Sequence, residues 1–205
     1  MNKEKYLDDL KEIKDMMERS SRFISLSGLS GISAGTFALI ATYLAYKTVY
    51  INQNYLSYRS AILTKETLTT LLLIAVVTLF LSIGAGILFT IIKAKKTNNN
   101  LWDLQTKRLL INLFIPLITG GIFCLMLLLK GYISLVAPLT LIFYGLALVN
   151  ASKYSLSEIR SLGLIEIMLG LLATYFIGYG LIFWALGFGI LHIVYGIVMQ
   201  IRYGS

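Results

Sequence analysis

The sequence predicts an all-α membrane protein with six transmembrane helices as three tandem helical hairpins, preceded by an amphipathic cytoplasmic helix. The first observation is composition. Of the 205 residues, 57% are hydrophobic and 14% are charged, whereas a soluble domain has about 45–50% apolar and about 25% charged residues. The second is a set of six apolar stretches near the length of about 20 residues with which a helix crosses a bilayer. We therefore expect a cytoplasmic helix in residues 1–22 and a transmembrane domain in residues 23–205.

Residues 1–22 predict an amphipathic helix that packs on protein. Tyr6, Leu10, Ile13 and Met17 recur at helical spacing, and charged residues fill the other faces. Six acidic residues balance six basic ones, so the helix lacks the cationic face of a lipid-surface binder. Three partners fit it: the protein's own bundle, a second copy of the chain, or a cytoplasmic protein. The segment has no apolar stretch typical of a cleavable signal, so we expect the first span to act as the insertion signal.

The six apolar stretches give the expected transmembrane spans. Two of them are interrupted by proline, at Pro116 and Pro138, and the fifth carries a glutamate. In chain order the predicted spans are Phe23–Tyr46, Leu68–Ile92, Leu109–Leu129, Ile133–Val149, Ile159–Ile177 and Leu181–Ile201.

Basic residues predict the orientation of these spans. Fourteen of the 18 Lys and Arg residues lie in the N-terminal segment, the 93–108 loop, the 150–160 loop and the C-terminus. Positive loops stay in the cytoplasm, so both termini are expected there, in a multi-pass protein of the cell inner (plasma) membrane. The net charge of +8 is spread over loops with no interleaved aromatic stripe. That pattern favours membrane lipids as partners and argues against nucleic acid.

Short turns and repeated glycines predict the hairpins. The third and fourth spans are joined around Lys130-Gly131, and the fifth and sixth around Gly178-Tyr179-Gly180. Such turns favour antiparallel neighbours. Each even-numbered span also carries a glycine three residues after an isoleucine and before three apolar residues, at Gly86, Gly145 and Gly196.

This glycine-punctuated pattern resembles the small acid-resistance membrane proteins of the HdeD type. The best local match runs from Arg160 to Tyr203, about a fifth of the chain, and is punctuated by Gly163, Gly170, Gly187, Gly189 and Gly196. The resemblance implies the six-span fold more than a role in acid stress, and the family offers no catalytic residues to transfer. The charged N-terminal helix departs from its pattern.

Two ionisable side chains, Glu166 and His192, lie deep inside the apolar stretches. They stand 13 residues before and 13 residues after Tyr179, at the centre of the last turn. At a rise of 1.5 Å per residue, each is about 20 Å from that turn, so both are expected at one depth, where they can pair. An unpaired glutamate charge there would cost on the order of 3 kcal/mol. The protonation of a Glu–His pair should respond to pH.

Asn112 and Asn150 are likewise expected at one level, near the cytoplasmic face. They stand 19 residues to either side of Gly131, which corresponds to about 28 Å. With Glu166 and His192 they form the candidate binding or relay residues for a proton or a small solute. The structural alternative is an interhelical hydrogen bond that only fixes the fifth span against the sixth.

Other classes of function receive less support. A non-transporting scaffold or stress-response component, recruiting a partner through residues 1–22, is the main alternative. A membrane-embedded lipid enzyme is a third, but the sequence holds no hydrolase, zinc-protease or phosphate-loop motif and only one histidine. Glu166 and His192 lack the third ligand of a metal site. We therefore expect no enzyme, metal or cofactor.

Overall fold

The computed structural model describes residues 27–50, 64–96 and 102–203, so the predicted helix in residues 1–22 lies outside the described residues. The described part is all-helical, which confirms the all-α part of the prediction. Within these three ranges, five helices are long and apolar enough to cross a membrane. The fifth predicted span is not among them, because its helix carries three charged residues, Glu158, Arg160 and Glu166.

The helices follow the predicted spans, with shifted ends. In chain order they are α2 (Gly28–Tyr50), α3 (Lys65–Lys96), α4 (Leu104–Leu129), α5 (Val136–Ala151), α6 (Ser157–Tyr175), α7 (Gly180–Trp184) and α8 (His192–Tyr203). Two 3-10 turns, η2 (Ile133–Leu135) and η3 (Ser152–Tyr154), flank α5. The π-helical segment η4 (Ala185–Leu191) joins α7 to α8, so the sixth predicted span is one continuous helix of three parts.

Pro138 does not interrupt a helix as the sequence suggested. The α-helix starts only at Val136, after η2, so Pro138 lies in the first turn of α5. A first-turn N–H has no partner within the helix, and proline is tolerated there. Pro116, in contrast, lies inside α4.

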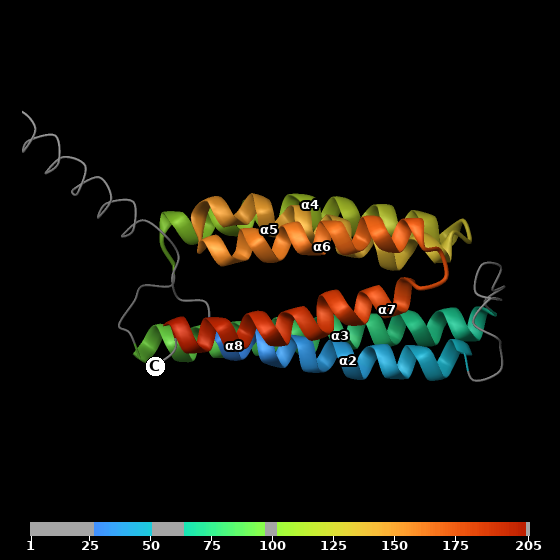
Figure 1. Ribbon diagram of the computed structural model, residues 1–205, viewed down its shortest axis with the longest axis horizontal. Coiled ribbons are helices and arrows are strands. Elements are labelled where there is room, and N and C mark those ends of the chain that lie inside the picture. The colour runs from blue at the N-terminus through green and yellow to red at the C-terminus, as the bar shows by residue number, and fades with distance from the viewer. Residues whose placement is uncertain (1–26, 51–63, 97–101, 204–205) are drawn as a thin grey trace, which may run out of the picture.

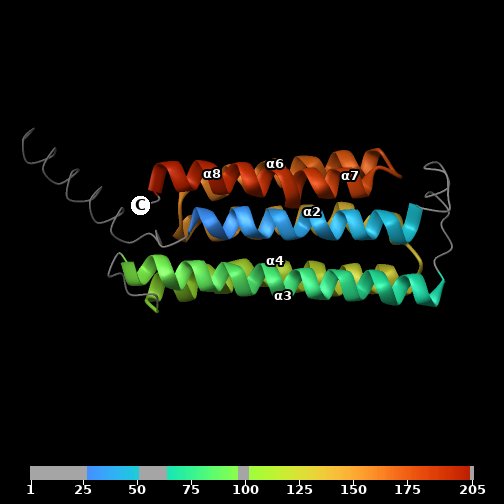
Figure 2. The ribbon, with the colours of Figure 1, turned by 90° about the horizontal axis from the view of Figure 1, so that it is seen from below.

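The helices form two stacked layers (Figure 1). One layer contains α3, α2 and α8, and the other contains α4, α5 and α6, with α2 and α5 as the central helices. In Figure 2 the first layer is nearer the viewer, so that α3 lies in front of α4, α2 in front of α5, and α8 in front of α6. The layers are bridged by α7 and η4, which precede α8 in the chain. Packing of α7 is on α5 and α6, and η4 packs on α2 in one layer and on α6 in the other.

The third predicted hairpin does not close along its length, which corrects the sequence-based arrangement. Packing joins α2 to α3 and α4 to α5, as the first two hairpins require. The turn after α6 is short, yet α6 packs chiefly on α5, and α8 packs chiefly on α2. Proximity along the chain therefore does not determine that α6 packs on α5 and α8 on α2. Contacts at glycine determine this pairing.

Two antiparallel helix pairs, α2–α8 and α5–α6, are held by backbone contact at glycine. A Cβ atom on Gly196 would lie 2.6 Å from the carbonyl oxygen of Gly28, and one on Gly163 would lie 2.7 Å from that of Gly145. These distances leave no room for a side chain. Lipid tails are as apolar as leucine, so close packing of small residues is what favours one helix partner over lipid. The glycines thus fix α8 on α2 and α6 on α5.

A helix cap at the start of α4 gives a testable prediction. The Thr106 backbone N–H and hydroxyl donate to Asp103 Oδ1 at 2.7 and 2.6 Å. These hydrogen bonds lower the pKa of Asp103 below its usual value, the side-chain bond most. We expect Asp103→Ala to reduce the free energy of unfolding by about 1 kcal/mol at neutral pH. Since the folded-state pKa is depressed, this contribution is complete above the unfolded-state pKa of about 3.9 and is lost as pH falls through the lower folded-state value.

Thermal unfolding in detergent, measured from neutral to acidic pH, tests the cap. Asp103→Asn is the matched control, because it keeps an acceptor for Thr106 but does not titrate. It should unfold near the wild-type temperature at neutral pH. Equal stability of wild type and Asp103→Ala at neutral pH would show that the cap contributes nothing.

Candidate functional site

Glu166 of α6 and His192 of α8 meet between the two layers. Glu166 Oε1 lies 3.5 Å from His192 Nδ1, at the common depth that their spacing from Tyr179 predicts. Glu166 has no exposed surface, and His192 is 7% exposed. The helices α6 and α8 pack mainly on other helices, so this side-chain contact joins two helices that are not primary packing partners.

Tyr144 of α5 completes a polar centre, defined here as Tyr144, Glu166 and His192. His192 Nδ1 lies 2.9 Å from the carbonyl oxygen of Gly187, and a carbonyl can only accept, so Nδ1 carries the hydrogen. The other ring nitrogen, Nε2, lies 2.7 Å from the Tyr144 hydroxyl. In the neutral imidazole Nε2 is therefore the acceptor and the tyrosine donates. The tautomer of His192 is fixed from both sides.

The π-helical segment brings Gly187 against the carboxyl group. A Cβ atom at Gly187 would collide with Glu166 Oε2 and with the Leu141 side chain, so only glycine fits. The π-helical turns of η4 end at Leu191, directly before His192. Such turns are rare and are often found at functional sites. Here they place the Gly187 carbonyl within reach of the His192 ring.

The Glu166 carboxyl group has no hydrogen bond to any described residue, although both its oxygens are buried. The 3.5 Å contact with His192 is an ion-pair distance, but the Nδ1 hydrogen is shared with Gly187. An unpaired carboxylate in this position would cost on the order of 3 kcal/mol. One added proton removes the net charge, because both a neutral acid beside imidazole and a carboxylate beside imidazolium are neutral as pairs. The geometry thus favours a centre that holds a proton.

The structure places the two candidate asparagines at the contact between α4 and α5, and their side chains make hydrogen bonds there and not with this centre. Asn150 Nδ2 donates to the Asn112 backbone oxygen at 3.0 Å, so the two residues are level, as their spacing predicts. Asn112 Nδ2 donates to the Arg108 carbonyl one turn earlier in α4. The Asn150 amide therefore holds α5 against α4 within one layer, whereas the Asn112 amide bonds only its own helix.

Sequence reasoning missed two tyrosines near His192. Tyr144 belongs to the polar centre, and the buried hydroxyl of Tyr195 has no hydrogen-bond partner among the described residues. Each of them directly precedes a glycine of the repeated signature, Gly145 or Gly196. A tyrosine next to a close-packed glycine lies at the contact between two helices. Its place directly before the signature glycine is the sequence feature that could have identified both tyrosines.

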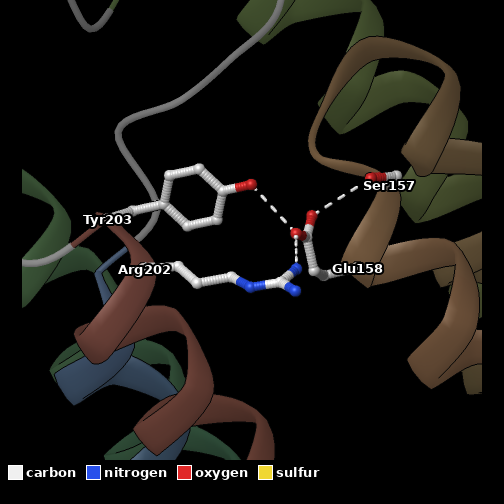
Figure 3. A network of polar contacts seen from close by, with 4 residues as sticks. All are labelled: Ser157, Glu158, Arg202 and Tyr203. Atoms are coloured by element: carbon white, nitrogen blue, oxygen red, sulfur yellow. Dashed lines mark hydrogen bonds and ion pairs between the residues drawn. The ribbon is translucent and has the colours of Figure 1, made fainter.

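A second polar cluster joins α6 to α8 at the end of the bundle where α6 begins and α8 ends (Figure 3). Arg202 Nη1 and the Tyr203 hydroxyl donate to Glu158 Oε1 at 2.8 and 2.9 Å, and Ser157 Oγ donates to Glu158 Oε2 at 3.2 Å. The side chain of Glu158 is 15% exposed and that of Arg202 is 61% exposed. This end cluster, Ser157, Glu158, Arg202 and Tyr203, is therefore in contact with solvent.

Among the residues that the structure describes, no group of three or more His, Cys, Asp or Glu side chains could hold a metal ion. Comparison of the chain with protein-family models, curated proteins and solved structures gives no match. The resemblance to the HdeD-type proteins therefore stays an expectation, and the polar centre is the basis for a proposed function.

Proposed function

We propose that this protein binds and releases protons at the polar centre as a step in moving protons, or a small solute with them, across the membrane. The observation that carries the proposal is the fully buried Glu166 carboxyl group, whose two oxygens have no hydrogen bond within the described residues. Ionisable residues inside a membrane protein are costly and typically serve function.

The geometry supports proton movement over the binding of a larger solute. The Tyr144 hydroxyl, the His192 ring and the Glu166 carboxyl group follow one another at 2.7 and 3.5 Å. Histidine can take a proton at one ring nitrogen and release one from the other. Gly187 and Leu141 fill the space beside the carboxyl group, which leaves a proton as the ligand that fits.

We propose further that α6 is a sixth span. Its length of 19 residues approaches that of its neighbours, and it runs beside α5 in direct backbone contact. Two of its three charges, Glu158 and Arg160, lie in its first turn, where they reach the bilayer surface, and the third is the proton-binding residue. With six spans, the positive-inside rule puts both termini of this proposed inner (plasma) membrane protein in the cytoplasm. Residues 1–22 would then be on the side where a second copy or a cytoplasmic partner could bind them.

Proton flux into liposomes tests the proposal. Purified protein is reconstituted, a potassium diffusion potential is applied, and internal pH is followed with a dye. We expect flux above that of protein-free liposomes, and loss of this flux in His192→Ala, because the ring links Tyr144 to Glu166. Glu66→Gln, at an exposed position in the first turn of α3, is the control and should keep wild-type flux. Wild-type flux equal to that of protein-free liposomes would overturn transport and favour the scaffold alternative.

A further inference from the structure

A groove lies between α2 and α7, at the end of the bundle where α2 ends. Its volume is about 280 Å³. Four of its lining residues belong to α2, and the others belong to the turn after α6, to α7 and to the start of η4. Tyr144, Glu166 and His192 are not among them, so the groove is separate from the polar centre.

The groove exists because α7 leaves the side of α2. The η4 segment packs on α2, but α7, which precedes it, packs mainly on α5 and α6 of the other layer. Figure 1 shows α7 rising from the layer of α2 towards the layer of α5 and α6. The last close contact is at Gly189 of η4, where a Cβ atom would collide with the Leu39 side chain of α2. From there towards Tyr46 and Gly178 the two helices diverge.

The inner part of the groove suits a hydrocarbon chain. Leu39, Leu181 and Ile182 line it with aliphatic side chains. Thr42 also lines it, but its hydroxyl donates to the Ala38 carbonyl oxygen at 2.9 Å, so this hydrogen is used within α2. A hydrocarbon chain gives up no hydrogen bond when it enters such a space, whereas a polar solute would lose its bonds to water.

The outer end of the groove carries aromatic rings and a cation. Tyr43 and Tyr46 line it, and Lys47 Nζ lies 4.8 Å from the centroid of the Tyr43 ring, which is a cation–π distance. Among the described residues no carboxylate forms an ion pair with Lys47. This lysine directly follows the predicted span Phe23–Tyr46, so it is expected at the bilayer surface. Tyrosine rings are typical of the headgroup level, and lysine there attracts anionic lipid.

We infer that this groove binds one anionic phospholipid, with an acyl chain between α2 and α7 and the phosphate at Lys47. The seven-residue separation of Leu39 and Tyr46 corresponds to about 10 Å, which lies within the roughly 15 Å of hydrocarbon in one leaflet. A volume of about 280 Å³ is near the lower end of the range for ligand sites, about 300–1,000 Å³, and fits one chain. Free phosphate would match only the lysine, and an uncharged lipid only the aliphatic wall.

This inference is independent of proton binding, because the groove and the polar centre share no residue. Native mass spectrometry of the full chain in detergent tests it with phosphatidylglycerol and phosphatidylcholine that carry the same acyl chains. We expect a Kd for the first phosphatidylglycerol that is about fivefold lower or more, since one lysine faces its charge. Lys47→Gln should remove this preference, and Lys47→Arg should keep it.

Lys130→Gln is the matched control for the charge. Lys130 is an exposed lysine that follows α4, and α4 ends at the same end of the bundle as α2 (Figure 1). Lys130 does not line the groove. The preference of this variant for phosphatidylglycerol should therefore equal that of wild type.

Ile182→Trp tests the place of the acyl chain. Ile182 lines the groove and is 48% exposed, so a larger side chain fills the groove without entering the packed interior. We expect the Kd of both lipids at this site to rise about fivefold or more. The matched control is Ile190→Trp, which makes the same change at a 47% exposed residue outside the groove. It should bind lipid as wild type does.

The unfolding temperature in lipid-free detergent shows whether each variant folds. If Ile182→Trp does not fold, Lys47→Gln, at an exposed position, still tests the site. Equal Kd values of the two lipids for wild type, or an unchanged preference in Lys47→Gln, would overturn the inference. Unchanged lipid binding in Ile182→Trp, together with loss of a dimer seen in wild type, would assign the groove to a second copy of the chain instead.

Discussion

Wild-type protein is expected to lose stability in alkaline solution, and Glu166→Gln is expected to abolish that loss. The Glu166 carboxyl group is fully buried without a hydrogen bond to any described residue. Removing the proton that it shares with His192 leaves a buried net negative charge, which costs on the order of 3 kcal/mol. Glutamine has nearly the same shape and cannot ionise. The free energy of unfolding of the variant should therefore stay level over the pH range in which that of wild type falls.

Denaturation in detergent, from mildly acidic to alkaline pH, measures this difference. Glu66→Gln is the matched control, because it removes a carboxylate from an exposed position and should keep the wild-type pH profile. His192→Ala should also change the profile, since it removes the second member of the pair. A Glu166→Gln profile that falls in parallel with wild type would rule out Glu166 as the group responsible.

Alanine at Gly145 or Gly196 is expected to destabilise the protein by about 1–3 kcal/mol, the usual cost of overpacking. The added Cβ would lie 2.5 Å from the Gly163 carbonyl oxygen in the first case and 2.6 Å from that of Gly28 in the second. Backbone cannot move aside as a side chain can, so the helices must separate. Alanine has a helix propensity about 1 kcal/mol more favourable than that of glycine. Any measured decrease in the free energy of unfolding is therefore what remains after this gain.

Gly86→Ala is the control that the repeated signature itself provides. Gly86 occupies the same place in the signature as Gly145 and Gly196, but a Cβ atom there would meet nothing within 4 Å. Its unfolding temperature in detergent should equal or exceed that of wild type. If the three alanine variants have the same unfolding temperature, contact at glycine does not determine which helices pack together.

The helices were predictable because length and apolarity, which define a span, are local properties of the sequence. Helix partners were not. The short turn at Gly178 predicts that α6 lies on α8, but partner choice depends on which glycines meet across space. Gly163 meets Gly145, and Gly196 meets Gly28. Neither match follows from the order of the chain.

The candidate site was predictable to the extent that depth in a membrane follows from residue count. Equal distances from Tyr179 place Glu166 and His192 together, and the same arithmetic places Asn112 beside Asn150. Depth does not give direction around a helix axis, so the asparagines were expected on the cytoplasmic side of the centre. In fact Asn150 bonds α5 to α4, and the Asn112 amide bonds its own helix. Tyr144 was missed because it comes from α5, a helix that the hairpin scheme pairs with α4.

Proton uptake by the purified protein tests the central proposal most directly. The number of protons bound per chain is measured in detergent from mildly acidic to alkaline pH for wild type and Glu166→Gln. We expect the variant to bind about one proton fewer over this range, because the pair loses its shared proton as pH rises. Uptake curves that superimpose would show that the polar centre does not bind a proton and would contradict the proposed function.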